Sequence, residues 1–107
     1  MQVYVKSPAI EFRLPPENDL HVVEEYCHQA CYDYIREAYG IYAQTFPEEY
    51  DVVEGFTLTN GAFVDRYKAY WVAERSGMLV NIYRGSDVTK TRLESYMMER
   101  FGNPHDK

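Results

Sequence analysis

Apolar and polar residues alternate along two short runs at the start of the chain, residues 2–6 and 9–14. A period of two residues is typical of strands that bury one face. Ser7-Pro8 lies between the runs and predicts a turn, so we expect an N-terminal hairpin. Pro15-Pro16 follows the second run and ends the second predicted strand.

The spacing changes from Asp19 onward, where apolar residues return every three or four positions. This pattern predicts an amphipathic helix, and Gly40 is placed to end it. The next segment, residues 41–54, is acidic and contains Phe46-Pro47, whose proline argues against continuation of the helix. The predicted buried stripe of the helix consists of Leu20, Val23, Cys27, Ala30, Tyr34 and Ala38.

The middle of the chain predicts a hairpin followed at once by a helix. Two β-prone runs, residues 57–59 and 62–64, are joined by Asn60-Gly61, a dipeptide suited to a two-residue turn. Asp65 can cap the first amides of the helix, and Gly77 stands where a left-handed terminator is expected. The predicted core-facing residues of this helix are Ala69, Val72, Ala73 and Ser76.

The C-terminal third predicts one more strand and one more helix. Residues 78–83 are apolar and β-prone, and Gly85-Ser86-Asp87 then turns the chain into a helix with Leu93, Tyr96, Met97 and Phe101 on one face. The whole pattern predicts an α+β fold, an antiparallel sheet of short strands with three helices packed on it. With 107 residues we expect a single domain over residues 1–101 and a short tail over 102–107.

The central segment also carries a resemblance. From Gly55 to Ala69 the chain reads Gly-Phe-Thr-Leu-Thr-Asn-Gly-Ala-Phe-Val-Asp-Arg-Tyr-Lys-Ala, followed by a small apolar helix and Gly77. It resembles a segment of small uncharacterised phage-encoded proteins over residues 55–77, and residues 9–13 look like a short strand of those proteins. Some small phage proteins of similar build look like inhibitors of bacterial defence. The resemblance implies either blockage of an immune protein complex, such as a CRISPR-Cas complex, or sequestration of a cyclic nucleotide signal.

The resemblance ends before the first predicted helix. The phage proteins commonly open that helix with an Arg-His-His cluster, whereas this chain has Pro15-Pro16-Glu17-Asn18-Asp19. The role of the basic cluster therefore does not carry over.

The sequence also indicates the cellular compartment in which the protein is expected. The sequence has no apolar stretch long enough to span a membrane and no basic start followed by an apolar segment. We therefore expect a cytoplasmic protein of an infected or host bacterial cell that does not contact a membrane. Cys27 and Cys31 are expected to be reduced thiols in that compartment.

Charge is distributed unevenly along the chain. Residues 14–65 hold eleven acids against Arg36 alone, whereas residues 66–107 hold eight bases and five acids. An acidic surface repels phosphates and attracts basic protein grooves, so we expect a protein partner and no direct binding of nucleic acid. The alternative is that the acids form only a solvated face. The acidic residues of the predicted contact surface are Glu24, Glu25, Asp33, Glu48, Glu49 and Asp51.

Aromatic residues make up 16% of the chain, and eleven of them are tyrosines. Tyr67, Tyr70 and Trp71 fall outside the predicted core stripe of the central helix, so we expect them on its flanks and outer surface. Exposed aromatic residues mark interfaces, either with a defence protein or in a homodimer built on Trp71. Alternatively, the tyrosines only fill the core and its rim.

Arginines beside aromatic residues provide a second candidate site. Arginine binds phosphate through two parallel hydrogen bonds, and aromatic faces stack on bases, which suits a nucleotide ligand. Trp71 and Arg75 can equally form a cation–π pair within one helix. The ligand-binding candidates are Phe56, Arg66, Tyr83, Arg84 and Arg92.

No pattern in the sequence supports catalysis or a metal. Cys27 and Cys31 provide two ligands where a zinc site needs four, and the acidic loop lacks the spacing of a calcium loop. His21 lies near Glu24 and Glu25, but no nucleophile accompanies this group. The sequence therefore favours a non-enzymatic anti-defence inhibitor without cofactors, with a cyclic-nucleotide sponge, in a homo-oligomer, as the alternative.

Overall fold

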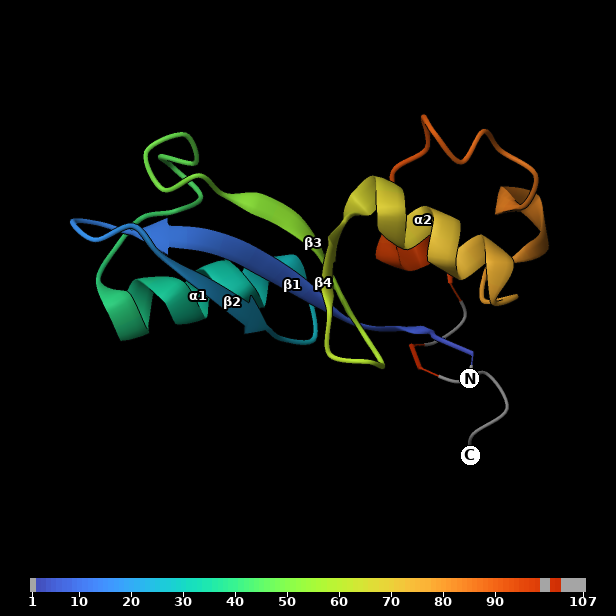
Figure 1. Ribbon diagram of the computed structural model, residues 1–107, viewed down its shortest axis with the longest axis horizontal. Helices are drawn as coiled ribbons and strands as arrows, with labels where there is room; N and C mark the ends of the chain where they lie inside the picture. The colour runs from blue at the N-terminus through green and yellow to red at the C-terminus, as the bar shows by residue number, and fades with distance from the viewer. Residues whose placement is uncertain (1, 99–100, 103–107) are drawn as a thin grey trace.

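The sheet is organised around one long central strand. The computed structural model describes residues 2–98 and 101–102, and its strand order is β2-β1-β3-β4 with every neighbouring pair antiparallel. Figure 1 shows helix α1 beside β1 and β2, and helix α2 beyond β4. The elements are β1 Val5–Leu14, β2 Asp19–Glu24, α1 His28–Tyr39, β3 Val53–Leu58, β4 Phe63–Asp65 and α2 Arg66–Arg75.

The predicted hairpin over residues 2–14 is wrong, because β1 continues through Ser7-Pro8 as one strand of 10 residues. A register shift between Val5 and Ser7 absorbs the irregularity. Pro8 is tolerated because its carbonyl faces β2 and accepts a hydrogen bond from Glu25 N at 3.2 Å, just past the end of that strand. The N–H that proline lacks is therefore not needed by the ladder with β3.

The first helix begins nine residues later than Asp19, at His28. Residues 19–24 form β2 instead, with Val23 opposite Ile10, because the same apolar positions also fit a two-residue alternation and β-branched Val22 and Val23 favour a strand. Cys27 Sγ accepts a hydrogen bond from Ala30 N at 3.4 Å and caps the helix.

The buried face of α1 also differs from the predicted stripe. Its buried residues are Cys31, Tyr32 and Ile35, whereas Tyr34 and Ala38 are exposed. Gly40 does end the helix, in the left-handed conformation with φ of 70°. The end of the helix was therefore predicted correctly, and its start and its orientation were not.

The central hairpin and helix form where the local signals place them, but the hairpin loop is longer than the predicted two-residue turn, because Leu58 N donates to Ala62 O at 2.8 Å and residues 59–61 form the loop. Asp65 Oδ1 accepts a hydrogen bond from Lys68 N at 2.8 Å and caps α2. Gly55 has a different reason to be glycine, because an added Cβ would lie 2.0 Å from the carbonyl oxygen of Val64. Three of the four predicted core residues, Ala69, Val72 and Ala73, are buried.

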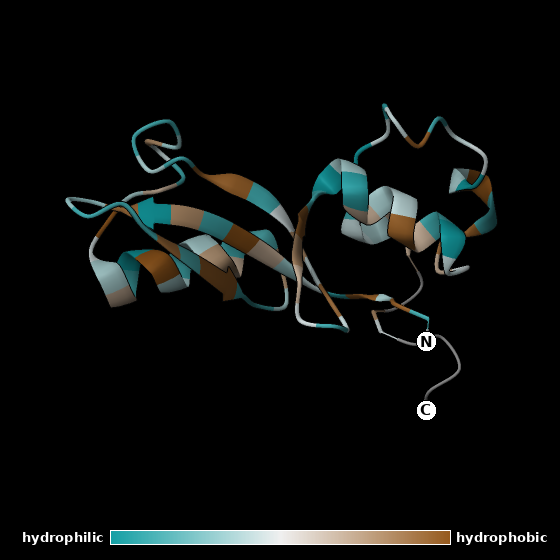
Figure 2. Ribbon diagram, in the orientation of Figure 1, coloured by the Kyte–Doolittle hydropathy of each residue, from teal (hydrophilic) through white to brown (hydrophobic). Residues whose placement is uncertain are grey.

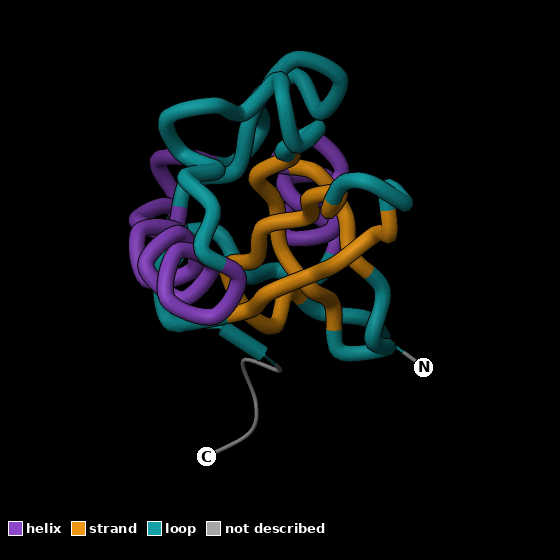
Figure 3. Tube along the Cα trace, turned by 90° about the vertical axis from the view of Figure 1, so that its left-hand side faces the viewer, coloured by secondary structure: helices purple, strands orange, loops and turns teal. Residues whose placement is uncertain are grey.

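The core consists of two clusters on one face of the sheet. One packs α2 against β3 around Phe56, and the other packs α1 against β1 around Ile10. Paired residues share a face, and Phe56 lies opposite Pro8, two residues from Ile10. Apolar positions accordingly recur along β1 and β2 in Figure 2, and Figure 3 shows α1 on one side of the strands.

The predicted fold class is wrong in its helix count, because the described residues form two α-helices, not three. Leu79 makes one isolated bridge with Met98 instead of starting a strand, and residues 81–83 and 95–97 are single 3₁₀ turns. Asp87 Oδ1 accepts hydrogen bonds from Thr89 N at 2.9 Å and Thr89 Oγ1 at 2.7 Å. Such local bonds compete with helix formation.

Residues 99–100 of the predicted final helix lie outside the described residues. Phe101 packs against the cluster around Phe56, and Gly102 N donates a hydrogen bond to Val5 O at 2.7 Å. The predicted tail, residues 102–107, lies outside the described residues apart from Gly102.

Candidate functional site

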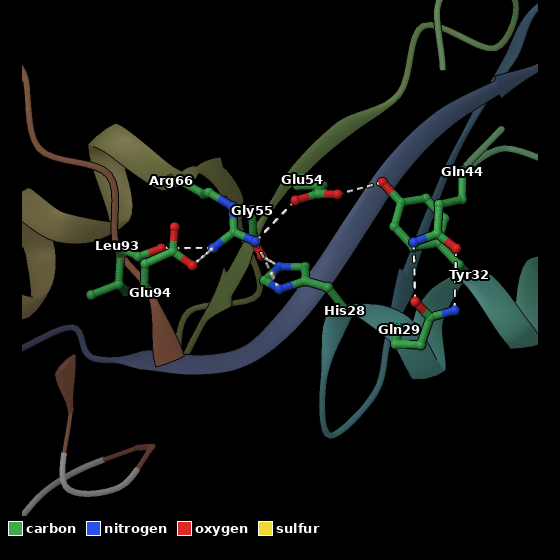
Figure 4. Close-up of polar contacts among 9 residues, drawn as sticks. All are labelled: His28, Gln29, Tyr32, Gln44, Glu54, Gly55, Arg66, Leu93 and Glu94. Atoms are coloured by element: carbon green, nitrogen blue, oxygen red, sulfur yellow. Dashed lines mark hydrogen bonds and ion pairs between the residues drawn. The ribbon is translucent and has the colours of Figure 1, made fainter. Parts of the chain in front are cut away.

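Arg66, the first residue of α2, is the centre of a buried polar network (Figure 4). Its side chain is only 9% exposed. Nη2 donates a hydrogen bond to Glu54 Oε1 at 2.9 Å, while Nη1 donates to Leu93 O at 2.8 Å and to Glu94 Oε2 at 3.2 Å. The guanidinium thereby joins β3 and the C-terminal segment to α2.

His28, the first residue of α1, lies beside this guanidinium. Its Nε2 is 2.7 Å from Gly55 O, which can only accept, so Nε2 carries the proton. Nδ1 then accepts from Arg66 Nη2 at 3.2 Å, and the imidazole is neutral. Burial lowers the pKa of His28, and the nearby Arg66 charge adds to this, although the hydrogen bond to Gly55 opposes it.

Glu54 links the network to the middle of α1. Tyr32 donates its hydroxyl proton to Glu54 Oε2 at 2.6 Å. Burial alone would raise the pKa of Glu54, but the hydrogen bonds from Tyr32 and Arg66 outweigh it and hold the pKa below its ordinary value. Burial and the bond to this carboxylate raise the pKa of Tyr32. Glu54 is therefore ionised and Tyr32 neutral at pH 7.

A pocket of about 500 Å³ lies next to the network. Tyr32, Glu54 and Arg66 line it together with Tyr67 and Arg92. Because the guanidinium of Arg66 is already held by two carboxylates, it has little capacity left for a phosphate. The network has the character of a structural link between both helices and β3.

The structure does not gather the five ligand-binding candidates. Arg66 and Arg92 line the pocket, and Phe56 lies buried below the Arg66 guanidinium, 5.8 Å from it. Tyr83 lies elsewhere, with its ring 5.7 Å from that of Tyr96. Arg84 Nε donates a hydrogen bond to Leu79 O at 3.0 Å.

The aromatic residues of α2 have three different environments. Tyr67 is exposed, as expected. Tyr70 is completely buried, so its predicted surface position is wrong, and its hydroxyl donates to the carbonyl of Tyr83. Trp71 is half-buried, with Lys68 Nζ 5.2 Å and Arg75 Cζ 4.5 Å from its ring centre. The cation–π pair that we considered as an alternative is therefore formed.

Two of the predicted acidic contact residues are paired. Glu24 Oε1 lies 2.9 Å from Lys6 Nζ, which lowers the pKa of Glu24, and Asp33 Oδ1 lies 3.6 Å from Arg36 Nη1. Within residues 2–98 and 101–102, no ion pair involves the other four, which are Glu25, Glu48, Glu49 and Asp51.

Three of these unpaired acids lie in the acidic loop, which we define as residues 41–52 between α1 and β3. Successive turns hold this loop, with Phe46 N donating to Tyr42 O at 3.0 Å and Val52 N donating to Pro47 O at 2.9 Å. Two hollows of about 410 Å³ each flank Pro47. The backbone hydrogen bonds of the loop therefore hold Glu48, Glu49 and Asp51 on its surface.

Exposed apolar side chains accompany the acids. Among residues 2–98 and 101–102, nine large apolar side chains are exposed, and six of them lie between residues 14 and 65, the segment in which acids outnumber bases. Two of them, Tyr42 and Phe46, belong to the acidic loop and are 58% and 50% exposed. Neither residue was predicted as a contact residue, although the loop position of Phe46, next to Pro47, is a signal of exposure in the sequence.

The Arg66 network was also missed as a unit. Its side chains come from residues 28, 32, 54, 66 and 94, and no local spacing relates them. Arg66 alone was among the candidates, and for a different role.

The thiols and carboxylates do not form a metal site in the part of the chain that the structure describes. Cys31 is buried, which raises the pKa of its thiol to about 11, and Cys27 caps α1. No helix among the described residues has the length and apolar character needed to cross a membrane. The chain matches no known protein family, no curated protein and no solved structure.

Proposed function

We propose that this chain is a non-enzymatic inhibitor that binds a component of bacterial immunity, such as a CRISPR-Cas complex, through the acidic loop and the exposed side of α1. The observation that supports this proposal is the coincidence of unpaired acids with exposed aromatic residues in one region. Tyr34 on α1 and Tyr42 and Phe46 in the acidic loop supply the aromatic contacts. The resemblance of residues 55–77 to phage proteins indicates the biological setting.

The proposed mechanism is occlusion of a basic groove. The acids of the loop provide a negative surface that speeds association with positively charged proteins. Tyr42 and Phe46 then supply apolar area, which holds the complex together once water is excluded. An immune complex uses such basic grooves for nucleic acid, so the bound inhibitor would compete with the nucleic acid.

The test uses a panel of bacterial strains, each with one defined immune system, that express the chain during phage infection. We expect plaque formation to recover in a strain whose immune complex is the target. The purified complex should then bind the wild-type chain with an affinity that falls as salt rises from 50 to 200 mM. The variant Glu48→Lys/Glu49→Lys/Asp51→Lys should bind at least 100-fold more weakly.

Matched variants separate the surface from general effects. Phe46→Ala should weaken binding about 10-fold or more, as expected for an aromatic anchor. Ile82→Ala removes a side chain that is 80% exposed outside the acidic segment, and it should leave binding unchanged. Equal binding by the triple lysine variant and the wild-type chain would contradict the proposal.

The second candidate function is a cyclic-nucleotide sponge, and the 500 Å³ pocket with Arg92 and Tyr67 on its wall supports it. A cyclic dinucleotide should then raise the melting temperature of the chain. Arg92→Ala should abolish that rise, whereas Arg84→Ala should retain it, because Arg84 bonds Leu79 outside the pocket. No thermal shift with any cyclic nucleotide would exclude this function.

A further inference from the structure

Strand β2 is one edge of the sheet, and every second residue turns its backbone groups away from β1. Glu25 N donates to Pro8 O directly beyond the strand. Bonded and non-bonded pairs alternate along an antiparallel ladder, so the ladder bonds of β2 belong to Asp19, His21 and Val23. The residues whose N–H and C=O groups point outward are Leu20, Val22 and Glu24.

This edge is open in the part of the chain that the structure describes. No hydrogen bond from another described residue reaches the outward backbone groups of β2. The side chains of Leu20 and Val22 are 51% and 43% exposed. An unpaired edge with exposed apolar side chains is a template for a further strand.

The side chains of β2 show which strand would fit. Val23 faces the α1 cluster, so Leu20 and Val22 project from the opposite face of the sheet and offer apolar contacts. The surrounding acids are Glu17, Asp19, Glu24 and Glu25, and within the described part of the chain only Glu24 is in an ion pair, with Lys6. A second copy of this chain would bring the same carboxylates together, whereas a basic segment would be attracted.

We propose that β2 accepts an extended segment of the partner, with alternating basic and apolar residues, as a fifth strand of the sheet. This inference rests on the proposed function and specifies how the partner is held. The outward N–H and C=O groups supply main-chain hydrogen bonds that favour an extended backbone. The apolar residues of the segment lie against Leu20 and Val22, and its cations, on the other face of the sheet, meet Asp19.

Proline at position 22 tests the backbone contact. Val22→Pro removes one outward N–H and leaves the bonds to β1 intact, because proline is tolerated on an edge strand when its nitrogen faces solvent. Val22→Thr is the matched control, since it keeps both the N–H and the β-branched shape. Circular dichroism of both variants verifies that they fold.

The probe is a synthetic eight-residue peptide of alternating lysine and valine, labelled for fluorescence anisotropy. We expect Val22→Pro to bind it at least 10-fold more weakly than Val22→Thr, and a peptide N-methylated at every second residue to lose binding. On the wild-type chain, peptide should slow amide exchange at Leu20, Val22 and Glu24. Equal binding by both variants, or unchanged exchange at these amides, would overturn the proposal, even if Val22→Pro does not fold.

The two proposals fail separately. If Val22→Pro inhibits the immune complex as well as wild type while the triple lysine variant of the acidic loop does not, the edge inference is wrong and the proposed function stands. If the peptide binds β2 as expected but no immune system in the panel is inhibited, the edge is a binding site and the proposed function is wrong.

Discussion

Arg66 Nη2 lies 2.9 Å from Glu54 Oε1, and this ion pair joins the first turn of α2 to β3. The arginine side chain is 9% exposed and the glutamate side chain 34% exposed. Solvent therefore reaches Glu54 but hardly reaches Arg66. Buried charge of this kind is tolerated because Nη1 and Nη2 bond two carboxylates, a carbonyl and an imidazole, although Nε has no hydrogen-bond partner among the described residues.

Arg66→Met should therefore lower the free energy of unfolding by about 3 kcal/mol, because Glu54 and Glu94 lose their cation. Urea unfolding followed by circular dichroism measures this loss. Arg66→Lys keeps the charge but cannot reach three acceptors at once, so it should also be destabilising, to a smaller degree.

The coupling between the two residues can be measured directly. The double variant Arg66→Met/Glu54→Gln should lose clearly less stability than the sum of the two single losses, since it leaves no unpaired charge at Glu54. Strict additivity would show that the pair does not act as a unit.

His28 should make stability depend on pH. Its pKa is lowered in the folded protein, so the unfolded chain takes up a proton first as pH falls. Stability from this residue is fully present above the ordinary value of 6.5 and is lost as pH falls from there through the folded pKa. The melting temperature of wild type should decrease over this interval.

His28→Gln should flatten that decrease, because glutamine can donate to Gly55 O but does not titrate. Glu54 also has a lowered pKa, and its contribution is lost only below 4.5. If the melting temperature decreased equally in wild type and His28→Gln between pH 7 and pH 5, titratable groups other than His28 would be responsible for the decrease.

Gly55→Ala should be strongly destabilising, by about 3 kcal/mol, because a Cβ would overlap the carbonyl oxygen of Val64 at 2.0 Å. The contact is with backbone, so β4 would have to move away from β3. Gly61→Ala is the comparison. That site has open space, and only its φ of 90° opposes a side chain, so the expected loss there is about 1 kcal/mol. Thermal unfolding of both variants tests whether Gly55→Ala loses more stability than Gly61→Ala.

Asp65→Ala should cost about 1 kcal/mol by removing the cap from the first turn of α2. Asp65→Ser keeps an acceptor at the same place and should retain most of the stability. If alanine and serine gave equal losses in urea unfolding, the role of Asp65 would be its charge and not the cap.

Local signals in the sequence predicted what depends on a few neighbouring residues. Asp65 caps α2, Gly40 ends α1, and Gly61 lies in the hairpin turn, because each effect involves one or two adjacent turns of backbone. The segment from Leu20 to Val23 was assigned wrongly, since its spacing fits both periods and the decision is made by pairing with β1.

The rest of the candidate site depends on residues far apart in sequence. Nothing near position 66 indicates that its guanidinium meets Glu54, His28 and Glu94, which come from three other segments. The final helix was predicted from apolar spacing after a turn at Gly85-Ser86-Asp87, and the hydrogen bonds of Asp87 with Thr89 compete with it. The acidic region, in contrast, was predicted from composition, because counting charged residues does not require a structure.

The contacts of Arg66 have a consequence for the order of folding. Its side-chain partners are separated from it by 12, 27, 28 and 38 positions along the chain. Contacts of such long range require several loops to close first, so this arginine is expected to find its partners late, after the rate-limiting barrier. Changing it should then speed unfolding and leave the folding rate nearly the same. The Arg66 guanidinium would then stabilise the folded structure without taking part in the folding nucleus.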